Sequence, residues 1–173
     1  MMNYRRNRLP GGTYFFTVVT ANRTPLFNNP AAVQRLRTTL RNVINRRPFT
    51  IDAMVVLPDH IHCLWTLPAD DTNYSTRWRL VKGGFTKSFQ QHSTGKPGKP
   101  KSLWQKRYWE HTIRDENDFN RHVDYIHYNP VKHGYVARAI DWPYSSFHRF
   151  VREGVLPVDW GINEAELEGV GSE

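Results

Sequence analysis

Residues 54–68, M-V-V-L-P-D-H-I-H-C-L-W-T-L-P, are the stretch that decides the fold. Two short apolar runs flank a proline-aspartate pair, which predicts two strands joined by a tight turn. His60 and His62 open the second strand. Because side chains alternate along a strand, both imidazoles point to one sheet face, while Ile61 and Cys63 point to the other. Two imidazoles on one face can share a metal ion.

The rest of the chain supplies the partners of this hairpin. A β-branched and aromatic run precedes it, and amphipathic stretches lie on either side. The expected strands are residues 13–20, 49–57, 60–67 and 108–114, and the expected helices are residues 30–46, 76–91, 115–129 and 147–152. The third helix is expected to end near Asn129, because Pro130 disfavours helical geometry in the residue before it.

The order β-α-β-β-α-β predicts an α+β fold of the ferredoxin-like, split βαβ kind. We expect an antiparallel four-stranded sheet with helices on one face, plus a C-terminal extension. Residues 1–152 are expected to form one domain with a basic N-terminal arm, and residues 153–173 an acidic tail. No apolar run is long enough for a transmembrane helix, so we expect a cytoplasmic, nucleoid-associated protein without a membrane partner.

The distribution of charge indicates a polyanionic partner. The whole chain carries +8, but no Lys or Arg follows Arg152, so the tail carries −6 and residues 1–152 carry +14. Six Trp, eight Tyr and nine Phe are interleaved with the basic residues. Aromatic faces stack on unpaired bases while cations contact phosphates, which favours nucleic acid over a merely soluble basic surface. The tail is either a solvated terminus or an intramolecular competitor for the basic surface.

The helix expected at residues 115–129 carries a second group of polar residues. On a helical wheel, Phe119, Val123 and Ile126 form its buried stripe. Tyr125 and Asn129 are i, i+4 neighbours on a flanking stripe with Asp118 and His122, whereas Tyr128 faces solvent. Taken alone, such a tyrosine is more often a packing residue than a nucleophile. We expect His122 and His127 to be surface histidines. If the flanking stripe lies over the histidine face, a phenol, an amide and two imidazoles converge.

Several segments together resemble a known family. V-L-P-D-H-I-H-C-L-W (56–65) resembles the HUH motif of single-tyrosine HUH transposases, and H-V-D-Y-I-H-Y-N-P-V-K-H-G (122–134) resembles their tyrosine helix. Y-R-R (4–6), G-G-T-Y-F-F-T-V (11–18), W-Q-K-R-Y-W-E-H (104–111) and D-W-P-Y-S-S-F-H-R (141–149) narrow the resemblance to the REP-associated tyrosine transposases, named after repetitive extragenic palindromes. The resemblance covers residues 3–160.

The resemblance implies an enzyme that nicks and joins single-stranded DNA at REP hairpins through a 5′-phosphotyrosine. Tyr125 would be the nucleophile, and His60, His62 and Asn129 would ligate Mg²⁺ or Mn²⁺. Many insertion-sequence relatives have Gln at the third ligand position, where this chain has the shorter Asn. A monomer is expected, with a dimer left open. The residues expected to bind DNA are Tyr4, Arg5, Arg6, Gly11, Gly12, Arg77, Trp78, Lys82, Lys87, Lys106 and Arg107.

Two other functions remain open at this stage. One is a REP-hairpin-binding protein without catalysis, which a cleavage assay distinguishes from the enzyme. The other is a metal phosphoesterase that uses water, in which Tyr125 has only a structural role. A covalent protein–DNA adduct separates this second alternative from the transposase.

Overall fold

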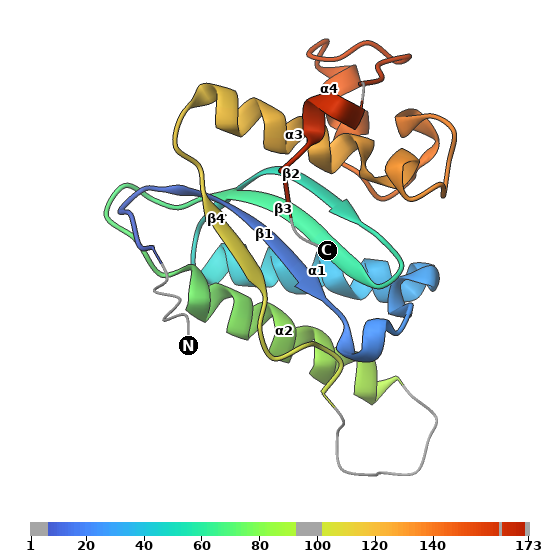
Figure 1. Ribbon diagram of the computed structural model, residues 1–173. Coiled ribbons are helices and arrows are strands. Elements are labelled where there is room, and N and C mark those ends of the chain that lie inside the picture. Colours follow the sequence, from blue (N-terminus) through green and yellow to red (C-terminus); the bar gives the residue numbers. More distant parts are fainter. Residues whose placement is uncertain (1–6, 93–101, 163, 172–173) are drawn as a thin grey trace, which may run out of the picture.

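Four antiparallel strands form the central sheet of the computed structural model, which describes residues 7–92, 102–162 and 164–171 (Figure 1). The strands are β1 (Thr13–Val19), β2 (Thr50–Val56), β3 (His60–Thr66) and β4 (Trp109–Thr112), in the spatial order β2-β3-β1-β4. The helices are α1 (Pro30–Arg46), α2 (Tyr74–Gln91), α3 (Glu116–Lys132) and α4 (Phe147–Arg152). Short 3-10 turns are η1 (Ala21–Arg23), η2 (Leu26–Asn28), η3 (Ala139–Asp141) and η4 (Glu164–Leu167). The order β1-α1-β2-β3-α2-β4 confirms the ferredoxin-like prediction.

One face of the sheet is covered by α1 and α2, as expected (Figure 1). The helix stripe carrying Leu36 and Leu40 packs there against inward-facing strand residues such as Phe16, Cys63 and Trp65. Helix α1 begins with Pro30 at its first position and is capped by the Asn29 side chain. This apolar core stabilises the sheet on one side, so its opposite face is free to carry the polar residues described next.

The opposite face carries the polar residues of β3 and is covered by α3 (Figure 1). β3 is an interior strand between β2 and β1, as predicted, and His62 is paired with Thr17 of β1. His60 and His62 are both buried on this side, with side-chain exposures of 1% and 0%. The alternation inferred from the sequence is therefore confirmed, and the two imidazoles lie beneath α3.

Helix α3 is longer than the sequence indicated. The Asp115 side chain caps its start by accepting from the Asp118 N–H at 2.8 Å. The predicted end near Asn129 is wrong, because the helix continues through Pro130 to Lys132 and closes with the His133 N–H donating to the Asn129 carbonyl at 3.0 Å. Asn129 and Pro130 are both buried, and their packing outweighs the local preference against a helical residue before proline. No described helix has the length and apolarity needed to cross a membrane.

His122 and His127 are buried rather than exposed, which corrects the sequence-based expectation. His127 is fully covered and hydrogen-bonds through Nε2 to the Ser146 hydroxyl at 2.8 Å. Phe147 and Phe150 of α4 pack against its ring. The segment after α3 folds back over this side of the helix, an arrangement that a wheel of the isolated helix cannot show.

The burial of His127 makes the stability of the protein dependent on pH. Burial, assisted by the positive charge of Arg149, lowers the pKa of His127 to about 3. The unfolded state regains the ordinary pKa of about 6.5, so it binds more protons than the folded state below that pH. We expect the free energy of unfolding to fall by a few kcal/mol between about pH 6.5 and pH 3.

Urea denaturation at several pH values tests this expectation. His127→Gln keeps a hydrogen-bonding group near Ser146 and removes the titration, so its stability should change less over the same range. His148→Gln, at a half-buried histidine of α4 bonded to the Trp142 carbonyl at 2.7 Å, is the matched control and should follow the wild type. Equal pH dependence in His127→Gln and wild type contradicts the prediction.

Candidate active site

The two histidines of β3 are oriented by hydrogen bonds to their Nδ1 atoms. His60 Nδ1 lies 2.6 Å from a carboxylate oxygen of Asp59, and His62 Nδ1 lies 2.9 Å from the Thr17 hydroxyl. Burial alone would raise the pKa of Asp59, but the hydrogen bonds and positive charges of His60 and Arg23 together outweigh it and lower the pKa, so the ionised carboxylate places the proton on Nδ1. Each imidazole then presents Nε2 as its metal-binding nitrogen, the usual role of such orienting partners.

Tyr125 lies beside this histidine pair. Its ring centroid is 5.1 Å from that of His62, and the His60 and His62 centroids are 4.8 Å apart. Phe15 of β1 contacts both Tyr125 and His62, at 5.9 and 5.6 Å between centroids. The structure thus brings together three of the predicted active-site residues from α3 and β3.

Asn129 lies on the same part of α3. It is one turn after Tyr125, which contacts His62, and one turn before His133, whose ring centroid is 5.3 Å from that of His60. Asn129 is fully buried. Its helical position therefore lies between two residues that reach the histidine pair, and an amide oxygen suits the same hard divalent ions as a carboxylate.

Other residues of this site were missed by sequence reasoning. Asp59 directly precedes His60, so the sequence alone could have identified it as the residue that orients this histidine. Thr17 required the β1–β3 register. His133 and Lys132 were missed because the helix was expected to end before them. Lys132 Nζ lies 5.0 Å from the centre of the Tyr125 ring and places a positive charge beside the phenol.

Two residues expected to bind DNA are internal. Arg77 is 2% exposed and donates to the Arg47, Asn73 and Pro48 carbonyls and to the Asp71 carboxylate. Trp78 is 1% exposed, and its ring stacks on Trp65 with centroids 4.2 Å apart. The prediction that they contact DNA is wrong, because Arg77 ties the start of α2 to the end of α1 and Trp78 belongs to the core.

The glycines of the arm also have a different role from the one predicted. The Gly11 N–H donates to the Asp71 carbonyl at 3.0 Å and the Gly12 N–H to the Leu9 carbonyl at 2.9 Å, so neither amide is directed at bases or phosphates. Gly11 has φ of +65°, and a Cβ on Gly12 would lie 2.9 Å from the Tyr14 hydroxyl. Both glycines therefore form the turn before β1. Tyr4, Arg5 and Arg6 lie outside the described residues.

The remaining predicted DNA contacts gather in one place. Lys82 and Lys87 of α2 and Lys106, which precedes β4, line a shared hollow of about 500 Å³. Lys82 Nζ donates to the Gln105 carbonyl at 2.9 Å, which ties the two segments together. Lys87, Lys106 and Arg107 are exposed. Among the described residues, this lysine hollow is one exposed basic feature, and α1 carries other exposed cations such as Arg41 and Arg46.

The C-terminal segment covers the tyrosine. Leu167 and Val170 are buried in the same apolar cluster as Tyr125 and Phe15, and Figure 1 shows this end of the chain passing from the α3 side toward the sheet. A Cβ placed on Gly171 would lie 2.8 Å from the Tyr125 hydroxyl oxygen and closer still to the ring. Tyr125 is consequently 1% exposed.

A histidine pair on an interior strand, facing a tyrosine on the helix that covers the same face of the sheet, defines the class of single-tyrosine transposases. A family described as "Transposase IS200 like" matches residues 10–129. The REP-associated tyrosine transposase of Escherichia coli K12 is 48% identical over 160 residues, covering 92% of this chain and 91% of the relative. The chain therefore belongs to the IS200-like transposases and, within them, to the REP-associated tyrosine transposases.

Solved structures agree with this assignment. A REP-associated tyrosine transposase bound to a REP hairpin matches with a TM-score of 0.85 and 46% identity, covering 94% of this chain and 93% of that one. A Deinococcus radiodurans protein described as a transposase matches with a TM-score of 0.50 and 19% identity, covering 69% and 92%. The second match supports the fold alone.

Proposed function

We propose that this transposase is a metal-dependent endonuclease and strand transferase that acts on single-stranded REP hairpins through a 5′-phosphotyrosine at Tyr125. The observation that carries the proposal is the contact of the Tyr125 ring with His62, at 5.1 Å between centroids, above a histidine pair whose Nδ1 atoms are already bonded. The REP hairpin is proposed as substrate because the relative matched with a TM-score of 0.85 is bound to one.

The donor set fits a divalent ion. His60, His62 and Asn129 would hold Mg²⁺ or Mn²⁺, and two imidazoles with one amide oxygen suit Mn²⁺ at least as well as Mg²⁺. When bound, the ion polarises the scissile phosphate and leaves positions for phosphate oxygens. Asp59 keeps His60 in the required tautomer, and Thr17 holds the His62 ring in its orientation.

The residues of the chain carry out the transfer itself. The Tyr125 hydroxyl gives up its proton to solvent and its oxygen bonds to phosphorus. The bond from phosphorus to the 3′ oxygen breaks, and that oxygen leaves as a 3′-OH after taking up a proton from solvent. Lys132, 5.0 Å from the Tyr125 ring, stabilises the negative charge on the attacking oxygen. The tyrosyl phosphodiester keeps the bond energy of the broken strand, so attack by a 3′-OH rejoins DNA without ATP.

Trapping of an adduct tests the proposal directly. Incubation with single-stranded REP DNA and Mn²⁺ should give a species of protein plus DNA mass that survives denaturing gel electrophoresis. Hairpin binding without cleavage supports the non-catalytic alternative. Cleavage without an adduct supports a water-using phosphoesterase.

Metal dependence is tested by His62→Ala, with EDTA on the wild type as an independent removal of metal. Both should lower cleavage by at least about a hundredfold, because the scissile phosphate then lacks the Lewis acid that would polarise it. Hairpin affinity should change little, since backbone contacts elsewhere dominate it. His92→Ala, at an exposed histidine after α2, is the matched control. Full cleavage in excess EDTA would overturn the metal requirement.

We also propose that the lysine hollow and Arg107 contact the DNA backbone. Lys87→Ala combined with Lys106→Ala removes two exposed cations and should lower the slope of log affinity against log salt by about two. Arg41→Ala combined with Arg46→Ala, at exposed arginines of α1, serves as a charge-matched control. Fluorescence anisotropy with a labelled hairpin at several salt concentrations measures both slopes. Identical slopes for the lysine pair and wild type contradict the assignment.

A further inference from the structure

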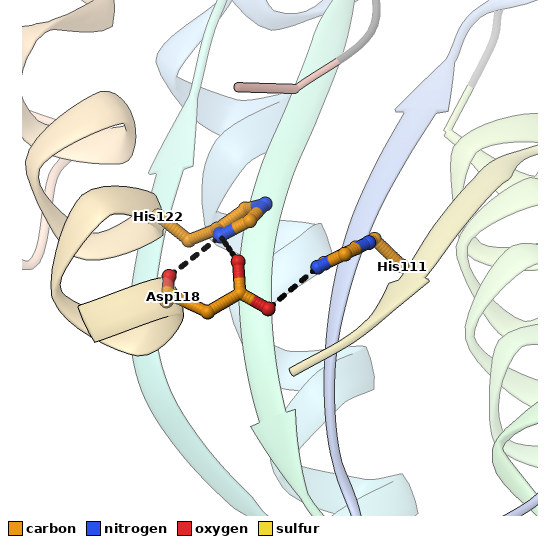
Figure 2. Close-up of side chains that lie close together, drawn as sticks. All are labelled: His111, Asp118 and His122. Atoms are coloured by element: carbon orange, nitrogen blue, oxygen red, sulfur yellow. Dashed lines mark hydrogen bonds and ion pairs between the residues drawn. The ribbon is translucent and has the colours of Figure 1, made fainter. Parts of the chain in front are cut away.

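A second cluster of metal-binding side chains lies outside the site described above. His111 of β4 and Asp118 and His122 of α3 point toward one another (Figure 2). One nitrogen or oxygen of each lies within 4.8 Å of the others. His111 Nε2 is 2.8 Å from Asp118 Oδ2, and His122 Nδ1 is 3.2 Å from Asp118 Oδ1. The two imidazole rings are stacked, with centroids 4.8 Å apart and an interplanar angle of 13°.

We propose that His111, Asp118 and His122 form a second metal site, selective for Zn²⁺ and chemically similar transition ions, that links β4 to the tyrosine helix. Two imidazoles and one carboxylate are a donor set that suits zinc, copper and nickel better than magnesium. A tetrahedral ion with bonds of about 2.1 Å needs ligand atoms about 3.4 Å apart. The contacts to Asp118 are close to this separation, whereas the three ligand atoms together span up to 4.8 Å, so the imidazoles must rotate to complete the site.

The residues around the cluster already form a hydrogen-bonded network. Asp118 Oδ2 accepts from the Arg114 N–H at 3.0 Å, and His122 Nδ1 donates to the Asp118 carbonyl at 2.7 Å. An ion that binds His122 through Nδ1 therefore replaces the hydrogen bond to this carbonyl.

The structure also shows how a metal ion can enter the cluster and which cation competes with it for Asp118. The His111 side chain is 28% exposed and lines an open hollow along β4, so an ion can enter from solution. The competing cation is Arg114, whose Nε lies 3.3 Å from Asp118 Oδ2 while its side chain is 74% exposed. An exposed guanidinium can move away when a divalent ion arrives. In the absence of metal, the same three residues hold together as a hydrogen-bonded network.

The site also has a consequence for the position of the nucleophile. His122 precedes Tyr125 by less than one helical turn, and its ring contacts Phe15 at 4.7 Å between centroids. Phe15 in turn contacts Tyr125 at 5.9 Å. An ion joining β4 to α3 therefore restrains the first two turns of α3 over the sheet, without touching the proposed catalytic metal.

Calorimetric titration of the full chain with Zn²⁺ tests the proposal. His111→Gln keeps a polar side chain but removes a zinc ligand, and it should bind one Zn²⁺ fewer per chain than wild type, or bind it at least about tenfold more weakly. Arg114→Ala removes the competing cation and should tighten the same event several-fold, a gain that a hydrogen-bonded network without metal does not produce. His92→Gln is the control and should match the wild type.

Cu²⁺ electron paramagnetic resonance gives a second readout. A copper ion held by His111 and His122 should show coupling to two nitrogens, and one nitrogen should be lost in His111→Gln. Zinc stoichiometry and affinity equal to wild type in both His111→Gln and Arg114→Ala would overturn the second site. Since these measurements follow binding and not cleavage, a negative result leaves the proposed Tyr125 chemistry standing, and an inactive but zinc-binding protein leaves the second site standing.

Discussion

Tyr125→Phe is expected to abolish formation of the covalent DNA adduct and strand cleavage while leaving the fold unchanged. The substitution removes one hydroxyl and keeps the ring that packs against Phe15 and His62. A phenyl ring has no oxygen to attack phosphorus, so the loss should be complete within the detection limit of a denaturing gel. Hairpin affinity should stay within about twofold of wild type, since most of it arises from phosphate contacts.

Tyr128→Phe supplies the matched control on the same helix. Tyr128 was expected to face solvent, but it is half-buried and lines a hollow with Lys132 and the C-terminal residues 165 and 167–170. Tyr128 lies three residues after Tyr125, about 60° away around the helix, on the side that meets the C-terminal segment. Its loss should leave cleavage near the wild-type rate. Loss of cleavage in Tyr128→Phe but not in Tyr125→Phe would show that the nucleophile has been assigned to the wrong tyrosine.

Most of the active-site arrangement can be predicted from the sequence, because the residues of strands and helices follow regular periods. Alternation in residues 60–67 placed His60 and His62 on one face, and the 3.6-residue period placed Tyr125 and Asn129 on one side of a helix. Length and order of the elements then left the ferredoxin-like plan as the simplest packing.

The failures came where tertiary packing overrides local preference. Pro130 favours a helix end near Asn129 and so conceals Lys132 and His133, although burial carries the helix one turn further. Arg77 and Trp78 are residue types that often bind DNA. In this fold, however, the Arg77 guanidinium donates to the Arg47 and Pro48 carbonyls, and the Trp78 ring stacks on Trp65. The His111–Asp118–His122 cluster joins a strand to a helix and was not visible in spacing alone.

The contact of the C-terminal segment with Tyr125 changes the hypothesis that the acidic tail competes with DNA for the basic surface. Charge alone suggested a DNA mimic. The structure shows an apolar contact instead, in which Leu167 and Val170 are buried with Tyr125. The segment is further held by Arg121, which donates to the Glu168 carbonyl at 2.8 Å. A phosphate cannot reach a phenol that is 1% exposed, so we propose that this segment must move away before cleavage.

Gly171→Ala is therefore expected to raise cleavage. The new methyl group would overlap the Tyr125 ring, and Gly171 also has φ of +75°, which disfavours alanine. Both effects destabilise the covered state only. A covered state favoured by about 1.4 kcal/mol leaves about a tenth of the molecules open, so its complete loss should increase the initial cleavage rate by up to about tenfold.

Gly169→Ala is the control that separates overlap from backbone strain. Gly169 has φ of +78°, but a Cβ there meets no atom within 4 Å, so its effect on cleavage should be clearly smaller. A chain ending at residue 163 should be activated at least as strongly as Gly171→Ala. That deletion keeps Trp160, which packs on Phe147 at 5.6 Å between centroids and would be lost in a deletion from residue 153.

Glu166→Gln combined with Glu168→Gln then distinguishes an apolar cover from an electrostatic mimic. The two substitutions remove tail charge and keep Leu167, Val170 and Gly171 in place. If the segment acts by covering Tyr125, this variant should cleave at close to the wild-type rate at low and moderate salt, whereas a charge mimic predicts activation that is largest at low salt. Initial rates of single-stranded hairpin cleavage in Mn²⁺ measure all four variants. Wild-type rates in both Gly171→Ala and the chain ending at residue 163, with both proteins shown to be folded, would contradict an inhibitory role for the C-terminal segment.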